Sequence, residues 1–158
     1  VYKRQVTEIA NPITSDHTLL RQYILPSLLR LLAANRHHEL PQRIYELGDV
    51  IRDSKNFLRA AWACAEVGSG FTSSKGIVQA LLRDMGANQD DVEFRPTDAE
   101  DGPWISGRGS HVFIQDEKIG EFGEIDPKVS GFFGIKSPIQ AGEIDLEAIY
   151  RIIPDPIS

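Results

Sequence analysis

Residues 43 to 53 read RIYELGDVIRD, and their alternating pattern predicts a β-strand. Side chains two positions apart lie on the same face of a strand. The two faces carry Tyr45, Leu47 and Ile51 on one side, and Ile44, Glu46, Gly48, Val50 and Arg52 on the other. We expect the first face to belong to the core. The second face combines a carboxylate, a glycine and a guanidinium, which is typical of a strand that forms the floor of a charged-ligand site.

The sequence on either side of this strand predicts an α+β fold. Further strands are predicted at 3–10, 58–68, 92–94 and 139–146, and two more within 111–125, with a loop at 52–56 and a turn at 116–118. Helices are predicted from Pro26 to about Asn35, at 72–86 and at 126–134, with a closing turn or short helix at 147–152. Strands outnumber helices and follow one another directly. An antiparallel or mixed sheet flanked by helices is therefore favoured over a βαβ array.

The composition is typical of a globular protein without a disulfide framework. The 158 residues, 41% of them hydrophobic and 25% charged, suffice for one domain with a substantial core. The formal net charge of −6 argues against a general nucleic-acid-binding surface. Cys64, the only cysteine, lies in an apolar strand, and no apolar run could span a bilayer, so we expect a cytoplasmic protein. The start suggests that residues 1–158 are a single domain from the C-terminal part of a longer chain.

The residues that could carry chemistry have structural explanations. In GSGFTSSKG, at 68–76, the lysine precedes the last glycine and no hydroxyl follows it, so the phosphate-binding loop of nucleotide hydrolases is not matched. The cations at 36–38 suit a solvated helix C-terminus, and the carboxylates of 89–101 suit a solvated loop. Neither His17 nor His111 has a neighbour at ligand spacing. We therefore predict no catalytic residue and no metal ligand.

Four stretches occur together in an order that is typical of one family. They are ANPITSDHTLLRQYILPSLLRLLAANRHHELPQRIYELGDVI at 10–51, SSKGIVQALLRDMG at 73–86, IGEFGEIDPKVSGFFGI at 119–135 and AGEIDL at 141–146. From about Ile9 to Leu146 the chain resembles the catalytic-core-like module of phenylalanyl-tRNA synthetase β subunits of the archaeal and eukaryotic type. The resemblance implies a class II aminoacyl-tRNA synthetase core, in which helices flank an antiparallel sheet.

The resemblance also implies a role. In that family the α subunit holds the aminoacylation site, and two α and two β subunits form the enzyme that attaches phenylalanine to tRNA(Phe) with ATP. The module expected here is non-catalytic and structural, and it supports assembly. Its implied partners are the α subunit and, through the whole enzyme, tRNA(Phe). No cofactor is implied for this domain, whereas ATP and magnesium are implied for the whole enzyme.

Two strands resemble the class II motifs that bind ATP. In motif 2 an arginine after the first strand holds the α-phosphate and an acid follows two positions later; Arg52 takes the arginine position and Ser54 that of the acid. In motif 3 a strand glycine lies close to ATP and a following arginine holds the γ-phosphate; Glu143 falls on the glycine and Leu146 on the arginine. The resemblance therefore implies a remnant site, in which Glu46 and Arg52 are vestigial positions.

Two alternatives stay open at this point. The chain could be a class II-like core that still binds ATP or an amino acid through Arg52, Glu46 and Arg21, or a small-ligand or peptide-binding domain that uses the same cleft. The helix and strand of class II motif 1, which build the interface between cores, are not complete in this chain. We therefore expect exposed apolar surface and self-association of the isolated piece.

Overall fold

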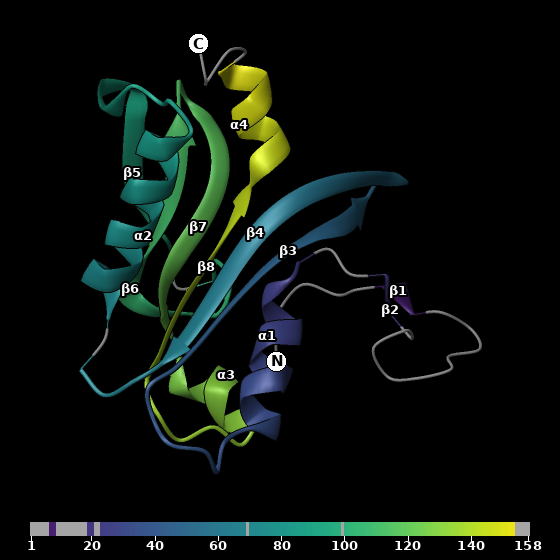
Figure 1. Ribbon diagram of the computed structural model, residues 1–158, viewed down its shortest axis with the longest axis vertical. Helices are drawn as coiled ribbons and strands as arrows, with labels where there is room; N and C mark the ends of the chain where they lie inside the picture. The colour runs from purple at the N-terminus through teal and green to yellow at the C-terminus, as the bar shows by residue number, and fades with distance from the viewer. Residues whose placement is uncertain (1–6, 9–18, 21–22, 69, 99, 154–158) are drawn as a thin grey trace.

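A six-stranded sheet forms the centre of the molecule in the computed structural model, which describes residues 7–8, 19–20, 23–68, 70–98 and 100–153 (Figure 1). The strand order is β3-β4-β8-β7-β6-β5, and every neighbouring pair is antiparallel. The bounds are β3 Gln42–Arg52, β4 Lys55–Ala65, β5 Val92–Pro96, β6 Trp104–Ile114, β7 Glu117–Ile125 and β8 Ile139–Asp145. Two short strands, β1 (Thr7–Glu8) and β2 (Leu19–Leu20), pair separately. The predicted α+β class with an antiparallel sheet is confirmed.

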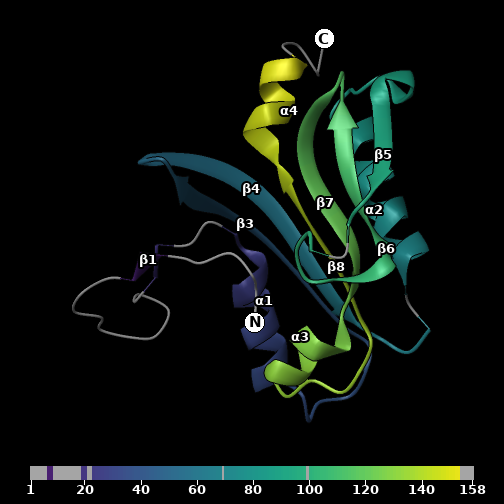
Figure 2. The same cartoon turned by 180° about the vertical axis from the view of Figure 1, so that it is seen from behind.

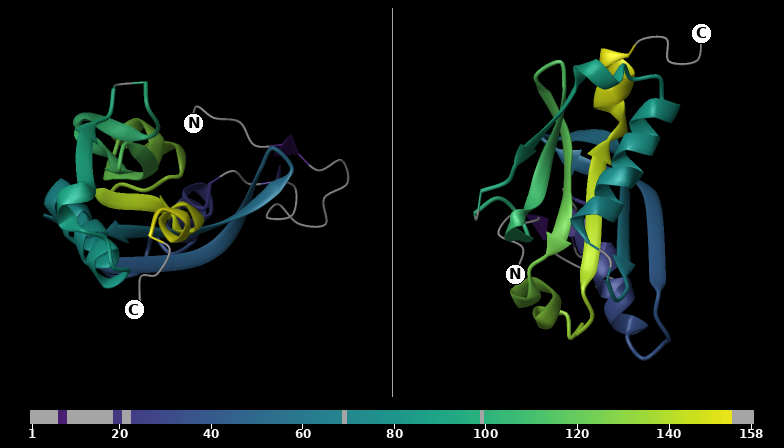
Figure 3. Two further views of the ribbon diagram at one scale, coloured as in Figure 1. Left: turned by 90° about the horizontal axis from the view of Figure 1, so that it is seen from above. Right: turned by 90° about the vertical axis from the view of Figure 1, so that its left-hand side faces the viewer.

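Helices cover both faces of this sheet (Figures 1 and 3). They are α1 (Leu25–Ala34), α2 (Phe71–Asp84), α3 (Pro127–Phe132) and α4 (Leu146–Ile152), and a 3₁₀ turn, η2, spans Gln89–Asp91. One apolar core joins α1 and α3 to the sheet, and a second core joins α2 and α4 to the opposite face. Because the sheet separates the two cores, a side chain on any strand faces one helix pair or the other.

Helix α1 forms where the sequence predicts it. Pro26 lies in its first turn, where a missing amide hydrogen costs nothing. Four of the leucines are buried, and only Leu31, at 47% exposure, faces solvent. The helix is amphipathic and lies with one face against β3, β4 and β8.

The expected burial of the opening strand is reversed in the structure. Tyr45 and Leu47 are 63% and 68% exposed, whereas Val50 on the other face is fully buried. The reason is topological: β3 lies at the edge of the sheet, and only α1 covers it, on the face that carries Ile44 and Val50. Helix α2 packs chiefly on β7 and β8 and leaves the Tyr45 side of β3 open.

Both hairpins are tighter than predicted. Asp53 and Ser54 alone connect β3 to β4, with φ of 50° and 62°, in place of the loop expected at 52–56. Gln115 and Asp116, with φ of 50° and 67°, connect β6 to β7. Two successive residues with positive φ match the twist of antiparallel strands, and short polar side chains tolerate this conformation. The β3–β4 hairpin therefore ends in a turn with no room for a ligand-binding loop.

Other expectations have mixed outcomes. The helix predicted at 126–134 forms as α3, and Asp126 caps it because its carboxylate accepts from the Lys128 amide at 2.9 Å. The helix predicted at 72–86 begins one residue earlier, as α2; Gly70 precedes it, and no side chain caps it. His17 and Arg21 lie outside the described residues. Within the part of the chain that the structure describes, no helix has the length and apolar composition that crossing a bilayer requires.

Candidate functional site

A row of polar residues crosses the sheet on the face that α1 covers. Residues in register on neighbouring strands share a face. From the β3 edge to the β5 edge, the row in register is Glu46, Ala61, Glu143, Glu121, His111 and Arg95. Five of these six residues are ionisable. A charged ligand could bind to such a row only where the side chains are not already paired within the protein. The partners of each side chain are therefore described next.

Glu143, on the central strand β8, is fully engaged by the protein itself. It is 2% exposed, and its Oε1 accepts from the backbone amides of Ile24 and Leu25, both at 2.8 Å. The first amides of a helix have no partner within the helix, so this carboxylate satisfies the N-terminus of α1. Because the contact joins residues 119 positions apart in the sequence, it fixes the helix on the sheet.

Arg59, on β4, occupies the other oxygen of the same carboxylate. Its Nε lies 2.5 Å from Oε2 of Glu143, and its Nη1 lies 4.0 Å from Asp145. The guanidinium is almost completely buried. Buried charges need both a counter-ion and hydrogen bonds, and this trio supplies them. The centre of the polar row is therefore closed by an internal ion pair.

The two vestigial positions of the sequence analysis are not brought together. Glu46 lies opposite Ala61, and Arg52 lies opposite Lys55 at the hairpin end. Six residues of extended strand separate them by about 20 Å. The Arg52 guanidinium instead lies over the ring of Tyr23, with its Cζ 4.7 Å from the ring centre, and Arg59 approaches the same ring at 5.7 Å. Tyr23 thus links the hairpin end to the segment before α1 through cation–π contacts.

Comparison with known proteins decides the family. Residues 2–146 match the family model described as "Phenylalanyl tRNA synthetase beta chain CLM domain". The chain belongs to the phenylalanyl-tRNA synthetase β-chain family. The phenylalanine–tRNA ligase β subunit of Archaeoglobus fulgidus is 36% identical over 142 residues, which cover 90% of this chain and 25% of the relative.

Other β-chain relatives agree with this assignment. The β subunit of Methanococcoides burtonii is 38% identical, over 89% of this chain and 25% of its own length. The β subunit of Pyrococcus horikoshii is 37% identical, over 94% of this chain and 27% of its own length. The chain thus spans about a quarter of the relatives that it matches. The structure is also similar to that of a pyrrolysyl-tRNA synthetase from Desulfitobacterium hafniense, with a TM-score of 0.71 and 14% sequence identity. The match covers 91% of this chain and 53% of that chain. The domain therefore has a class II synthetase fold.

Within this β-chain domain, the positions that resemble ATP ligands carry structural side chains. Glu143 anchors α1, as described above. Leu146 opens α4 and is buried in the core on the α2 and α4 face, away from the polar row. Ser54 lies in the two-residue turn. Each of these residues therefore has a structural role in the fold.

The structure adds a histidine cluster that the sequence analysis missed. His111 lies between two carboxylates: its Nε2 is 3.0 Å from Asp101, and its Nδ1 makes a longer ionic contact of 3.6 Å with Glu121. Lys118 lies 3.1 Å from Glu121. Glu121, on the neighbouring strand, and Asp101, ten residues earlier in a loop, have no spacing signal in the sequence. The available signal for this cluster was His111 itself, because a histidine in a strand that also carries buried apolar residues needs polar partners.

The charges of this cluster reinforce one another. Glu121 and Asp101 raise the pKa of His111, against the opposing effect of burial. Burial by itself raises the pKa of Glu121, but His111 and Lys118 together bring it below its usual value. The hydrogen bond with His111, and then that with the Asp98 amide, lower the pKa of Asp101. The cluster holds the loop around Asp101 against the sheet.

We expect this cluster to make stability depend on pH. The contribution of His111 is complete below 6.5, its ordinary pKa, and is lost as pH rises through the raised folded-state pKa. Those of Glu121 and Asp101 are complete above 4.5 and 3.8 and are lost as pH falls. Urea unfolding should therefore give a larger stability difference between the parent and His111→Gln at about pH 5.5 than at about pH 8.5. Exposed His37→Gln is the control, and an equal difference at both pH values would contradict the expectation.

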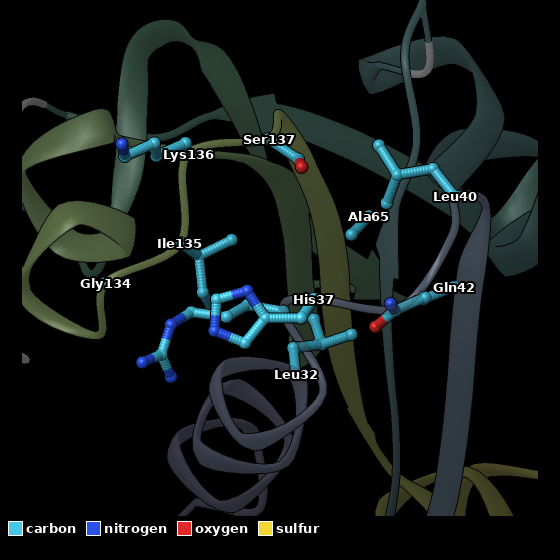
Figure 4. Close-up of a pocket in the computed structure, with 10 residues that line it drawn as sticks. Leu32, His37, Leu40, Gln42, Ala65, Gly134, Ile135, Lys136 and Ser137 are labelled. Atoms are coloured by element: carbon cyan, nitrogen blue, oxygen red, sulfur yellow. The ribbon is translucent and has the colours of Figure 1, made fainter.

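The predicted solvated end of α1 borders a cavity of about 290 Å³ (Figure 4). Leu32 and Ile135 form apolar walls, His37 lies across the opening, and Lys136 extends away from it. Arg36 donates to the Ala33 carbonyl at 2.8 Å, as a cation at a helix C-terminus does. Across the described ranges, no group of three or more His, Cys, Asp or Glu side chains is placed to hold a metal.

Proposed function

We propose that this domain is a non-catalytic, structural module of a phenylalanyl-tRNA synthetase β subunit. It supports assembly with the α subunit into a heterotetramer that attaches phenylalanine to tRNA(Phe). Relatives named phenylalanine–tRNA ligase β subunit, at 34–38% identity, support this proposal. ATP and magnesium would act at the α subunit, and tRNA(Phe) would bind to the whole enzyme rather than to this domain alone.

The observation that carries the non-catalytic role is the engagement of Glu143. A triphosphate at this place would meet a buried carboxylate instead of a glycine, and like charges repel strongly where water is excluded. Removing Glu143 would not open a site, because Arg59 and the α1 amides would then lose their acceptor. The same residues that exclude ATP fix α1 on the sheet. This structural use of Glu143 supports the proposal that the domain serves assembly rather than catalysis.

Co-expression with the phenylalanyl-tRNA synthetase α chain of the same organism tests the proposal. The two chains should elute together from gel filtration, and light scattering should give the mass of a mixed complex. A folded domain that elutes alone at micromolar concentrations would contradict the assembly role. The parent β chain at full length, co-expressed in parallel, shows whether the α chain itself is competent.

Titration with magnesium ATP tests the alternative that the core still binds nucleotide. We expect no saturable heat of binding at about millimolar nucleotide, which is the weak end of specific affinities. We also expect Arg52→Ala to change nothing, because Arg52 lies at the hairpin end over Tyr23. Saturable binding that Arg52→Ala weakens would establish the alternative. Thermal shifts across amino acids and nucleotides extend the same test to small ligands.

A further inference from the structure

Two adjoining cavities lie at the end of the sheet where β8 begins. Figure 2 shows α1 and α3 side by side at this end, with the loop that leads from α3 to β8. The cavity at the C-terminal end of α1 has a volume of about 290 Å³, and a second cavity, of about 500 Å³, is lined by α3 and by strands β6 and β7. Residues 135–137 of the loop line both cavities, so the two adjoin along this segment. We refer to them together as the double cavity.

Aliphatic side chains form much of the inner wall of the double cavity. Leu32 and Ile135 line the first cavity, and Ile105 and Ile125 line the second. Aliphatic groups bind favourably to such walls because binding removes apolar surface from water. Among the described residues that line either cavity, none is Phe, Tyr or Trp, and His37 supplies the only aromatic ring. Single-stranded nucleic acids usually bind by stacking several bases on aromatic rings. The walls therefore favour aliphatic side chains over nucleobases.

Positive charge borders the double cavity. Arg36 lines the first cavity, Arg108 lines the second, and Lys136 lines both. Over the whole chain Lys and Arg number 17 and Asp and Glu 23, so these cations are a local excess. Among the described lining residues, Glu124 is the only carboxylate, and its Oε2 accepts from Nη1 of Arg108 at 2.6 Å. A positive site on a negatively charged protein attracts an acidic partner.

Both arginines are held by the protein and keep further donors for a ligand. Glu124 is buried at 8% exposure, whereas the Arg108 side chain that it binds is 61% exposed. Nη1 of Arg36 donates to the Ala33 carbonyl, and the rest of this residue is exposed. A guanidinium has five N–H donors and binds carboxylates with two parallel hydrogen bonds. Because each guanidinium is already positioned, less side-chain entropy is lost when a carboxylate binds.

We propose that the double cavity binds an acidic peptide segment, rich in aliphatic residues, of a partner protein. Two aliphatic side chains would occupy the two cavities, one on either side of residues 135–137. Carboxylates next to them would bind Arg36, Lys136 and Arg108. Apolar anchors within a polar rim are the usual arrangement of protein interfaces. The double cavity lies at the opposite end of α1 from Glu143, so the proposal does not depend on the closed ion pair at the centre of the sheet.

Fluorescence anisotropy with a labelled ten-residue peptide of alternating Glu and Leu tests the charges. We expect saturable binding to the 158-residue chain, with a Kd below about 1 mM at low salt. The double variant Arg36→Gln, Lys136→Gln should weaken it about tenfold. The matched control is Arg83→Gln, Lys55→Gln, which removes two exposed charges outside the double cavity. Absence of saturable binding at about 1 mM, or equal weakening by the control, would overturn the proposal.

The apolar walls are tested with a variant at the mouth of the first cavity. Leu40 lines this cavity and is 40% exposed, so Leu40→Ser is expected to leave the fold intact and to weaken peptide binding about threefold or more. Leu31→Ser is the matched control, because Leu31 is 47% exposed and lines neither cavity. A peptide of alternating Glu and Ser should bind at least about tenfold more weakly than the leucine peptide. Equal binding of the two peptides would overturn the role of the walls.

Two further probes separate an acidic peptide from other anions. Inorganic phosphate and a ten-nucleotide oligouridylate should each compete with the leucine peptide only weakly, because neither has aliphatic groups for the cavities. Tighter binding of the oligonucleotide, lost in the double variant Arg36→Gln, Lys136→Gln, would replace the peptide with a nucleic acid and overturn the proposal. Because no α chain is present in these titrations, their failure leaves the assembly role to its own test.

Discussion

Replacement of Glu143 by alanine should lower the free energy of unfolding by about 3–5 kcal/mol, as breaking a buried ion pair usually does. The variant leaves Arg59 buried at 4% exposure, and its remaining ion-pair partner among the described residues is Asp145 at 4.0 Å. It also removes the acceptor of the Ile24 and Leu25 amides. Because small domains have about 5–15 kcal/mol of stability in total, this single change would remove a large share of it.

Urea unfolding followed by circular dichroism measures the Glu143 effect. Glu143→Gln should cost less than Glu143→Ala, because an amide oxygen can still accept from the α1 amides. Glu117→Gln is the surface control: Glu117 pairs with Arg151 at 2.5 Å, but both side chains are exposed, so we expect a change within about 1 kcal/mol. A Glu143→Ala midpoint equal to that of the control would show that the ion pair does not hold α1.

Gly142→Ala should destabilise the domain by about 1–3 kcal/mol through overpacking. A Cβ at this position would lie 2.2 Å from Cζ2 of Trp62 and 2.8 Å from Cβ of Phe122. The indole cannot move aside freely, because it is buried and its Nε1 donates to the Ser74 hydroxyl at 3.2 Å. The glycine therefore provides the space that the indole occupies on the α2 face.

A double-mutant cycle isolates this steric cause. Trp62→Leu is itself destabilising, but it should make the added Gly142→Ala change much less costly, with a coupling of about 1 kcal/mol or more. Gly76→Ala is the matched control, since nothing lies within 4 Å of a Cβ there and Gly76 is inside α2. We expect that variant to be stabilised by about 0.5–1 kcal/mol. Equal costs of Gly142→Ala in both backgrounds would exclude the indole as the cause.

Local sequence signals predicted the elements of this fold well. The first turn of α1 follows from Pro26, α3 follows from Asp126 and Pro127, and the apolar periodicity of 77–85 marks α2. Each of these signals depends on only a few neighbouring residues, so it can be recognised without knowing how the rest of the chain folds. The alternation in β3 likewise predicted a strand with two different faces. It could not say which face a helix covers, because the edge position of β3 is set by the topology.

The site was less predictable because its contacts are distant in sequence. Arg59 and Glu143 are 84 positions apart in the sequence. Neither their spacing nor the composition around them indicates that they form a pair. A charged residue next to the apolar run AAWACA was the available signal for Arg59, since a buried guanidinium demands a partner. The family resemblance only implied that Glu143 and Leu146 align with ligand positions. It could not show that Glu143 anchors α1 or that Leu146 is buried in the core.

The position of β8 in the sheet bears on how the chain reaches its native state. The last strand in sequence lies at the centre, between β4 and β7, and it is the element that joins the β3–β4 hairpin to the β5–β6–β7 meander. During synthesis these two pieces can form early, since their pairings are local, but each presents an unpaired inner edge until residue 139 and beyond are available. The N-terminal helix also awaits Glu143 for its anchor. A ribosome-bound chain that has not yet reached β8 therefore consists of two unjoined parts of the sheet, whose inner edges are exposed to chaperones and to wrong strand partners until residues 139–145 are made.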